Sequence, residues 1–594
     1  MSQYNKQQQW GVTAPVSTEL PTDHELKLTE DLVRTLHRFG LFESEAEAQK
    51  RVNVLNKLNI IVKDFVYRVG KLQGLTEKEA KNAGGKIFTF GSYKLGVYNT
   101  GADIDTLCVL PKHVERDHFF TIMYDMLKER PEVTELTAVE DAYVPVIRMH
   151  FSGIPIDFVC ASLSMAVVPD DLDLSDNNIL SGLDERCIRS LNGSRVTDEI
   201  LRLVPSVPVF RLALRTIKLW AKKRAIYSNI MGFLGGVAWA MLVARVCQMY
   251  PNACAASIVT RFFRIMYQWG WPQPVILKSM DEGPLPVRQW NPKLFPADKS
   301  HRMPVITPAY PSMCATHNVT DSTRDIMLNE FRKSGKIAEK IMIGTGRWVD
   351  LFEETDFFQI YNHYLQIVAS SYSAQAQLHW SGLVESKVRQ LVLKLELVEL
   401  LQIAHPYIKG FDKVHYCFPG KESWDAAHGD FRISERSFDL DGDHNEEERI
   451  KSFTFLKPEE RAILKPIYTT IFYIGLKVEP SRDDSSGPRK LNLVWPTNEF
   501  LKSVKMWDKF DHKVMGITIN NVKGSSLPEE LAGKRRPRKI QLHRHQSQVS
   551  PLLQHFSPPP RSLSVSPSLT YDSSQSSIST NAYACSNQHN PVDS

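Results

Sequence analysis

The stretch that most constrains this chain is GADIDTLCVL, residues 101–110, in which two carboxylates lie inside an apolar run. Acidic residues are uncommon in strands and costly to bury without a partner. Side chains alternate between the two faces of a strand, so Asp103 and Asp105 project together while Ile104 points into the opposite layer. Two neighbouring carboxylates repel each other unless a cation lies between them. The run therefore predicts a strand that carries a metal site or, as the plainer alternative, an exposed loop with two acids.

Three further features favour the metal site. A β-type run at 86–90 ends in Gly91-Ser92, a turn whose N–H groups and hydroxyl can hold phosphate oxygens. Asp157 is a third acid in an apolar run, and it follows a hairpin signal at Ser152-Gly153. Three carboxylates around two Mg²⁺ ions, typically about 3.5–4 Å apart, are what an in-line phosphoryl or nucleotidyl displacement needs. In the same hairpin, Pro155 predicts that one strand is an edge or irregular strand.

The composition is typical of a globular protein with several domains. The chain has 594 residues, of which 42% are hydrophobic and 23% charged, and its formal net charge is only +5. The eight cysteines form no CxxC pair and the polar N-terminus has no signal-peptide pattern, so reduced, intracellular cysteines are expected. Residues 226–244 lack charge, but polar interruptions and glycines predict a buried helix rather than a membrane span.

A basic stripe accompanies the amphipathic helix predicted near residues 208–228. Arg211, Arg215, Lys218 and Lys222 recur at helical spacing beside an apolar face. Like charges at this spacing weakly destabilise a helix. The stripe predicts a solvated face or, as the alternative, a contact to a polyanionic ligand.

The last part of the chain differs in composition. Residues beyond about 505 are rich in Ser, Pro, Gln and His, and we expect them to be disordered. Within them, GKRRPRK (533–539) is a compact basic run typical of nuclear import or of a nucleic-acid contact. The segment DLDGDHNEEER (439–449) is similar to a calcium loop, but His444 stands where an EF-hand needs Gly and Ile450 where it needs Glu. An exposed acidic loop is expected there.

Longer motifs carry a resemblance to a known family. FTFGSYKLGVYNTGADIDTLCV resembles the GS…DxD signature of polymerase-β-like nucleotidyltransferases, and RCIRSLNGSRVTDEIL and MPVITPAYPSMCATHNVT resemble eukaryotic nuclear poly(A) polymerases. The resemblance spans about residues 10 to 500 and implies an α+β fold. The implied parts are a flexible N-terminus (1–18), a polymerase-β-like nucleotidyltransferase domain (19–165), a helical central domain (166–350), an RNA-recognition-like C-terminal domain (351–505) and a disordered Ser/Pro-rich tail with the basic cluster (506–594).

The resemblance also implies a site. Asp103, Asp105 and Asp157 would be catalytic and would hold two Mg²⁺ ions, for which Mn²⁺ can substitute. These three acids would also contact the nucleotide, together with Phe90, Gly91, Ser92, Asn99, Ile104, Asn192, Lys218, Tyr227, Gly236 and Val237. Plainer interpretations stay open for four positions: a surface Lys218, a core Tyr227, a helix-packing Gly236 and a loop-bracing Asn192. Arg211, Arg215 and Lys222 keep the interpretation of a solvated face.

One departure from the family lies beside the acidic run. Family members often have Thr-Lys where this chain has Asn99-Thr100, which removes one Lys charge from a phosphate or RNA contact but leaves the chemistry. Asn99 can still donate a hydrogen bond to a nucleotide.

The implied activity is template-independent transfer of AMP from ATP to the 3′-hydroxyl of RNA, with release of pyrophosphate. The implied partners are the 3′ end of pre-mRNA and the factors of 3′-end cleavage and polyadenylation. We expect a monomer with no membrane contact, located in the nucleus, with a cytoplasmic form left open. No RNP1-like string is present, so RNA contacts are expected mainly to the backbone. The alternatives are a terminal uridylyltransferase and a catalytically silent RNA-binding scaffold.

Overall fold

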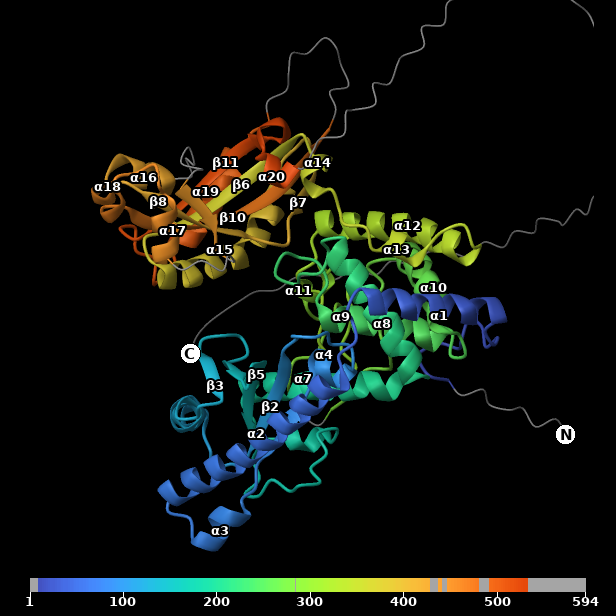
Figure 1. The fold of residues 1–594 in the computed structure, drawn as a ribbon. Coiled ribbons are helices and arrows are strands. Elements are labelled where there is room, and N and C mark those ends of the chain that lie inside the picture. Colours follow the sequence, from blue (N-terminus) through green and yellow to red (C-terminus); the bar gives the residue numbers. More distant parts are fainter. Residues whose placement is uncertain (1–8, 284, 428–435, 441–445, 480–490, 533–594) are drawn as a thin grey trace, which may run out of the picture. The chain divides into compact units, whose positions relative to one another are not determined.

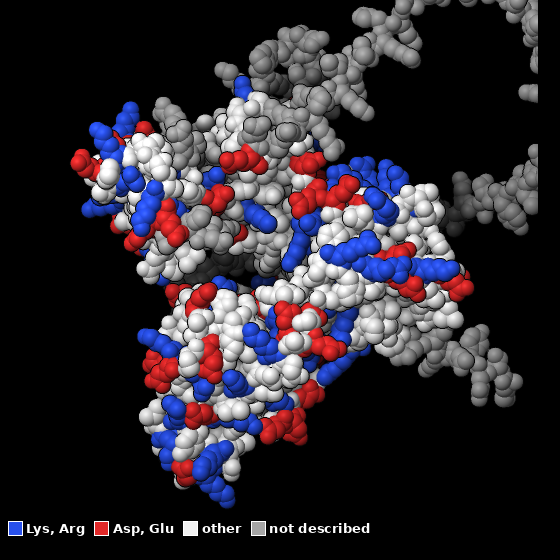
Figure 2. All heavy atoms as spheres, viewed as in Figure 1, with Lys and Arg blue, Asp and Glu red and all other residues white. Residues whose placement is uncertain are grey.

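The computed structural model of the chain describes residues 9–283, 285–427, 436–440, 446–479 and 491–532 (Figure 1). Two sheets and the helices around and between them in the sequence make the α+β fold that was predicted. Basic and acidic side chains are interspersed over the face shown in Figure 2, which agrees with the small net charge.

Capping residues explain where the first helices begin. Thr22, Ser44 and Thr76 each accept a hydrogen bond from the backbone of a Glu three residues later, and that Glu caps the hydroxyl residue in return. The three helices are α1 (Asp23–Arg38), α2 (Glu45–Leu72) and α3 (Glu77–Asn82). In the sequence, Leu28, Leu32, Leu36, Leu58 and Ile61 recur at the spacing that predicts helices between Pro21 and Val69, and α1 and α2 confirm that pattern.

The first sheet has the order β1-β2-β5-β4-β3 among the described residues. Its strands are β1 (Lys86–Thr89), β2 (Ile104–Leu110), β3 (Val133–Val139), β4 (Val146–Phe151) and β5 (Ile154–Ser162). Neighbouring strands are antiparallel except β2 and β5, which run parallel. Strand β2 is buried at every position but one, which confirms the buried strand rather than the exposed loop.

The hairpin predicted at Ser152-Gly153 joins β4 to β5, and both turn residues have positive φ, 52° and 76°. The prediction that Pro155 marks an edge or irregular strand is wrong, because β5 is the middle strand of the sheet. Proline is tolerated here because pairing with β2 begins only at Ile156, so Pro155 needs no N–H toward that neighbour.

Helices cover both faces of this sheet. Helix α2 packs on one face, where Phe65, Ile104 and Phe158 belong to one apolar core. Helix α7 (Glu185–Leu203) packs on the other, where Leu107 and Leu191 meet. Short helices α4 (Gly91–Leu95), α5 (Arg116–His118) and α6 (Tyr124–Lys128), with a π-helical turn at Phe119–Met123, lie in the connections.

The central helices form the largest apolar core. They are α8 (Val207–Lys223), α9 (Gly236–Met249), α10 (Ala255–Gln268), α11 (Pro296–Lys299), α12 (Asp321–Met342) and α13 (Trp348–Leu351). Helix α9 is buried along most of its length, which confirms a buried helix within residues 226–244. None of the described helices combines the length and hydropathy that a membrane span requires. The seven cysteines within the described residues are free, as expected, and Cys585 lies outside them.

The expectation of a flexible N-terminus over 1–18 does not hold for residues 9–18. The N–H of Val16 donates to Met249 O (2.8 Å), and Gln248 Nε2 donates to Trp10 O (3.1 Å). Arg245 Nη2 donates to Thr13 Oγ1 (2.7 Å). These bonds hold residues 10–16 against the end of α9, where Arg245 and Gln248 are buried. Residues 1–8 lie outside the described part.

The second sheet belongs to a β-α-β-β-α-β arrangement with extra strands. Its core elements are β6 (His363–Ser371), α15 (Ala374–Leu395), β7 (Leu401–Pro406), β8 (Phe411–Cys417), β10 (Lys465–Val478), α19 (Val494–Lys505) and β11 (Met515–Lys523). The smaller elements are α14 (Phe357–Ile360), α16 (Lys421–Ala427), β9 (Ser437–Asp439), α17 (Glu446–Ser452), α18 (Pro458–Ala462) and α20 (Glu529–Ala532). The sequence TTIFYIGLKVE (469–479) predicts a strand from its β-branched and aromatic residues, and β10 confirms it up to Val478.

The two faces of this second sheet are both covered. Helices α15 and α19 pack on one face. On the other face, Tyr364 and Tyr473 are at most 2% exposed, and Phe357 of α14 packs with them. Aromatic side chains on the open face of an RNA-recognition module usually stack on bases. Here these aromatics are buried, which agrees with the missing RNP1-like string.

The structure corrects the predicted start of the tail at residue 506. Strand β11 pairs with β6 over nine residues, from Met515↔Ser371 to Lys523↔His363. Met515, Ile517 and Ile519 alternate at strand spacing, but the polar composition of the whole segment beyond 505 outweighed this short signal. The predicted disorder of 533–594 and the basic run at 533–539 fall outside the described residues. So does the middle of the predicted acidic loop, residues 441–445.

Trp220 lies at the centre of the core of the central helices, so its replacement tests how that core packs. The indole is fully buried against Trp239, Phe263 and Phe331, and its Nε1 donates to Ser334 Oγ at 2.7 Å. We expect Trp220→Ala to lower the free energy of unfolding by about 4 kcal/mol, because it leaves a large cavity and an unpaired hydroxyl. Urea unfolding followed by circular dichroism measures the loss.

Leu378→Ala is the matched control, because that side chain is 72% exposed and its loss should stay within about 0.5 kcal/mol. A loss below about 1 kcal/mol for Trp220→Ala would contradict the packing described here.

Candidate active site

Three carboxylates meet at one end of β2 and β5. Asp105 and Asp157 are direct neighbours in the parallel register of the two strands, and Asp103 immediately precedes β2. Each of the three offers an oxygen, and these oxygens lie within 4.8 Å of one another. Ile104 points to the opposite side and is fully buried in the core under α2. The prediction that the three acids gather is therefore confirmed.

The electrostatics of the cluster fit a site for a cation. The pKa of Asp105 is raised to about 7, first because burial disfavours the charged form and then because Asp103 and Asp157 carry like charges. Burial also raises the pKa of Asp157, while the Arg148 guanidinium, with Nε 3.5 Å from Asp157 Oδ1, opposes that rise. Carboxylate oxygens are hard donors that suit a divalent cation such as Mg²⁺. The residues present thus fit a divalent metal ion.

The turn after β1 lies against Asp105. The N–H of Phe90 donates to the backbone oxygen of Asp105 (3.0 Å), and the Ser92 N–H donates to its carboxylate. Gly91 has φ of +61°, and a Cβ there would lie 2.0 Å from Asp105 Oδ2. Only glycine fits this position, because both the backbone conformation and the space exclude a side chain. Thr197 Oγ1 of α7 accepts from the Gly91 N–H at 3.3 Å.

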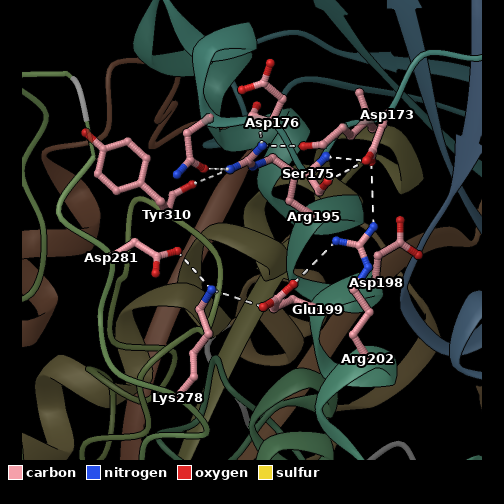
Figure 3. Close-up of polar contacts among 12 residues, drawn as sticks. Asp173, Ser175, Asp176, Arg195, Asp198, Glu199, Arg202, Lys278, Asp281 and Tyr310 are labelled. Atoms are coloured by element: carbon pink, nitrogen blue, oxygen red, sulfur yellow. Dashed lines mark hydrogen bonds and ion pairs between the residues drawn. The ribbon is translucent and has the colours of Figure 1, made fainter.

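A network of polar side chains fixes α7, which packs on this turn (Figure 3). Arg195 is 4% exposed, and its guanidinium donates to Asp176 O (3.1 Å), Tyr310 O (3.1 Å) and Asn177 Oδ1 (2.5 Å). Ion pairs extend the network along α7 to residues before and after it: Lys278–Glu199, Lys278–Asp281, Arg202–Glu199 and Arg202–Asp173. The network ties α7 to two distant loops and so holds Thr197 at Gly91.

Helix α8 and the start of α9 supply the other wall. A cleft of about 400 Å³ is lined by Gly91, Ser92, Asn99, Asp103, Asp105, Lys218, Tyr227, Gly236 and Val237, all predicted, and by Leu95, Val97, Tyr98, Ala102, Thr197, Leu214 and Lys222. A Cβ at Gly236 would lie 2.7 Å from Tyr227 Oη, so the glycine lets the hydroxyl approach the beginning of α9.

Charge and burial set the state of the two polar groups on this wall. Burial lowers the pKa of Lys218 to about 8, helped by the nearby cations Lys222 and Arg215 and opposed by the acidic cluster. Its Nζ donates to Val97 O at 3.1 Å. Burial, with Asp103 and Asp105, raises the pKa of Tyr227 to about 12, so its hydroxyl stays protonated and able to donate.

Three predicted nucleotide contacts do not line the cleft, and Asp157 joins it only through the acidic cluster. Ile104 lies in the core, and Phe90 packs against Gly193 of α7. Asn192 lies on α7, and its buried Oδ1 has no hydrogen-bond partner within the described part of the chain. Ile104 is buried in the core under α2, whereas Phe90 is half-buried because it packs between the first sheet and α7.

The interpretation of a solvated face for the basic stripe is wrong for Arg211 and Arg215, whose guanidinium groups donate to backbone carbonyls. Lys222 is exposed, yet it lines the cleft with Nζ 5.6 Å from the centre of the Tyr227 ring. Its spacing of four residues from Lys218 could have indicated this position. Thr197 carries no such signal, because only the packing of α7 brings it to the cleft.

Three acids on a mixed sheet, a glycine-serine turn and a lysine-bearing cleft together define a nucleotidyltransferase site. Family models described as the poly(A) polymerase nucleotidyltransferase domain, central domain and predicted RNA binding domain match residues 11–204, 209–354 and 356–540. The chain belongs to the poly(A) polymerase family.

Curated relatives cover nearly the whole chain. Poly(A) polymerase pla1 of Schizosaccharomyces pombe is 52% identical over 541 residues, which are 89% of this chain and 95% of that protein. Poly(A) polymerase PAPa of Candida albicans is 48% identical over 542 residues, 90% of this chain and 95% of that protein. The solved structure of Cid1 in complex with its short product ApU has a TM-score of 0.39 and 13% identity, over 56% of this chain and 99% of that chain. That similarity is too low to carry an argument.

The raised pKa of Asp105 predicts a pH-dependent stability in the metal-free protein. Between about pH 4 and pH 7 the folded state binds more protons than the unfolded state, so stability falls as the pH rises. With metal chelated at pH 8, we expect Asp105→Asn to raise the free energy of unfolding on the order of 2 kcal/mol, because it removes a buried, repelled charge. Thermal unfolding in EDTA measures this gain, which should shrink at pH 5.

Asp170→Asn is the control, because that exposed carboxylate pairs with Lys63 at 2.9 Å and its pKa is lowered. It should give no gain at pH 8. A loss of stability for Asp105→Asn in EDTA at pH 8 would refute the repulsion argument.

The tight fit of Gly91 predicts a selective loss of activity. In Gly91→Ala, the new methyl group must displace the Asp105 carboxylate, so we expect at least a hundredfold lower rate of nucleotidyl transfer. Gly40→Ala has a similar φ of +66° with nothing within 4 Å, and it controls for backbone strain alone. If both variants keep full activity with unchanged melting temperatures, the contact with Asp105 has no role.

Proposed function

We propose that this member of the poly(A) polymerase family adds AMP from ATP to the 3′-hydroxyl of RNA without a template and releases pyrophosphate. The observation that carries the proposal is the opening of one cleft on both the acidic cluster and the lysines of α8. Nucleotidyl transfer needs carboxylates that bind metal ions, and it needs cationic side chains that bind the phosphates. The curated relatives are named as poly(A) polymerases, which supports ATP as the substrate over UTP.

The acidic cluster is proposed to bind the ions. Asp103, Asp105 and Asp157 would hold two Mg²⁺, and Mn²⁺ can substitute because it also prefers oxygen ligands. Such ions, when bound, supply charge stabilisation at the attacking and leaving oxygens. Rigid strands β2 and β5 keep the three carboxylates close despite their repulsion. Since the ions neutralise that repulsion, the carboxylates would be ionised in the working enzyme.

The remaining cleft residues are proposed to bind and orient ATP. The Ser92 hydroxyl and the N–H groups of its turn would hold phosphate oxygens. Lys218 would exchange its bond to Val97 O for a phosphate, whose charge also keeps the ammonium protonated. Tyr227 would donate its hydroxyl to the nucleoside, with Gly236 and Val237 on the adenine side. Asn99 would add a neutral donor at the rim of the cleft.

RNA is the proposed second substrate, in agreement with the predicted RNA binding domain that matches residues 356–540. Because the aromatic face of the second sheet is buried, we propose contacts mainly to the RNA backbone. Such binding weakens steeply with salt and discriminates little between sequences.

Partners and location rest on the family resemblance. We propose that factors of 3′-end cleavage and polyadenylation recruit the enzyme, that it acts as a monomer, and that it works in the nucleus. The basic run at 533–539 supports nuclear import, and a cytoplasmic form stays open as the alternative.

Primer extension with the purified full chain tests the proposed activity. With an RNA primer, Mg²⁺ and each NTP in turn, we expect extension by ATP far above the other three and none in EDTA. Asp105→Ala should lower the rate by at least about a thousandfold, because it removes a carboxylate shared by the acidic cluster. Asp170→Ala, which alters an exposed carboxylate outside the cleft, should retain the wild-type rate.

Preferred incorporation of UTP would favour the uridylyltransferase alternative. Absence of incorporation with every NTP, in a chain that still binds RNA, would favour the silent scaffold.

A further inference from the structure

Basic side chains of α8 bind four consecutive backbone carbonyls, from the last residue of α4 onward. Arg211 Nε donates to Leu95 O at 2.9 Å. Arg215 donates through Nη2 to Gly96 O (2.7 Å) and through Nη1 to Tyr98 O (2.9 Å). Lys218 Nζ donates to the carbonyl between them, Val97 O (3.1 Å). The segment 95–98 is thus bound to α8 at every carbonyl.

The carbonyls of Leu95 and Gly96 attract cations because α4 ends there. The last carbonyls of α4 have no partner within the helix and carry partial negative charge. Gly96 ends the helix in the left-handed region with φ of +72°, and a Cβ there would lie 2.5 Å from Arg211 Nε. Glycine is therefore needed for the close approach of the guanidinium as well as for the turn.

A third element joins the same arginine. Arg215 Nη1 also donates to Leu41 O at 2.6 Å, and its guanidinium lies 4.9 Å from the centre of the Phe42 ring. One half-buried side chain thus connects α8, the segment after α4 and the segment between α1 and α2. The planar fork of arginine makes these three bonds at once, which a lysine ammonium at the end of a flexible stem cannot reproduce.

The same helix α4 contacts the acidic cluster. It begins at Gly91 and Ser92, whose backbone lies against the Asp105 carboxylate, and it ends at the carbonyls bound by α8. Any shift between α8 and residues 95–98 therefore changes the distance between Lys218 and Asp105. Within the described part of the chain, Arg211 and Arg215 pair with no carboxylate. Both donate to backbone oxygens, and Arg215 also lies over an aromatic ring.

We propose that Arg211 and Arg215, here named the arginine clamp, are positioning residues for nucleotidyl transfer. The clamp holds residues 95–98 on α8 when Lys218 leaves Val97 O for a phosphate of the nucleotide, so the lysine moves while the loop and α4 stay in place. This inference rests on the proposed function in its assignment of Lys218 to ATP. Arg211 and Arg215 act through Lys218 and α4, without contact to the reacting atoms.

A double-mutant cycle separates positioning from plain stabilisation. We expect Arg215→Lys to lower kcat/KM for ATP about tenfold, with the KM for the RNA primer unchanged, because the clamp sets the geometry of the ATP site. In a Lys218→Met background, the same change should lower kcat/KM for ATP less than twofold, because the lysine whose distance from α4 the clamp sets is absent. Melting temperatures are recorded for all four proteins. Equal effects in both backgrounds would overturn the proposal.

The matched control is Arg224→Lys, at the end of the same helix. Arg224 binds Glu330 Oε2 at 2.7 Å and Glu353 O at 3.1 Å, and it does not contact residues 95–98. Its replacement should leave kcat/KM for ATP within twofold of wild type. An equal tenfold loss there would show a general effect of arginine loss on α8, against the proposal.

Two further measurements keep the proposal falsifiable. Calorimetric binding of Mg²⁺-ATP to the four proteins gives the same double-mutant cycle without requiring nucleotidyl transfer. If the wild type is inactive, that result counts against the proposed function. The affinities for Mg²⁺-ATP then still test the role of the clamp. If Arg215→Lys does not fold, Gly96→Ala displaces Arg211 instead, with Gly74→Ala (φ of +80°, open space) as the control for strain. A wild-type kcat/KM for ATP in Gly96→Ala would overturn the role of the clamp.

Discussion

Repulsion among three carboxylates is the constraint on which the rest of the site depends. The parallel pairing of β2 with β5 puts Asp105 beside Asp157, and Asp103 completes a cluster whose oxygens lie within 4.8 Å of one another. Such a cluster is unfavourable by itself, because burial first and then the like charges of Asp103 and Asp157 raise the pKa of Asp105. The apolar packing of both sheet faces offsets it, since Ile104 on one side and Leu107 on the other are fully buried. Rigidity of the strands is thus what lets the chain keep a cation site assembled.

Two helices, α7 and α8, hold the turn that connects the acidic cluster to the rest of the cleft. Helix α7, held by the network around Arg195, presses Thr197 onto the Gly91 turn. Helix α8 binds the other end of α4, because Arg211 and Arg215 donate to carbonyls of residues 95 and 96. The glycine-serine turn is therefore fixed between the acidic cluster and α8, and a cleft with acids on one wall and lysines on the other results. The residues of the basic stripe therefore have two roles: the two arginines bind backbone carbonyls, and the two lysines line the cleft.

Several sequence-based expectations failed for one shared reason. Pro155 predicted an edge, yet β5 lies in the middle of the sheet, because its pairing with β2 starts one residue later. The segment predicted as a disordered tail contains β11, which pairs with β6, a strand more than 140 residues earlier in the sequence. Arg211 and Arg215 looked like a solvated face, since their carbonyl partners belong to other elements. In each case a local pattern was overruled by a neighbour that is distant in sequence.

The sequence by itself determined the elements and the chemistry. Capping residues set the ends of the first helices, the turn at Ser152-Gly153 set a hairpin, and alternation along β2 put Asp103 and Asp105 on one face. The tertiary structure decided which distant residues meet them. Thr197 and Lys222 reach the cleft, Ile104 and Phe90 do not line it, and Asp157 arrives through a parallel neighbour. The physical reason is that alternation and helical spacing act over a few residues, whereas the register of parallel strands and the packing of helices on a sheet are fixed only when the whole core closes.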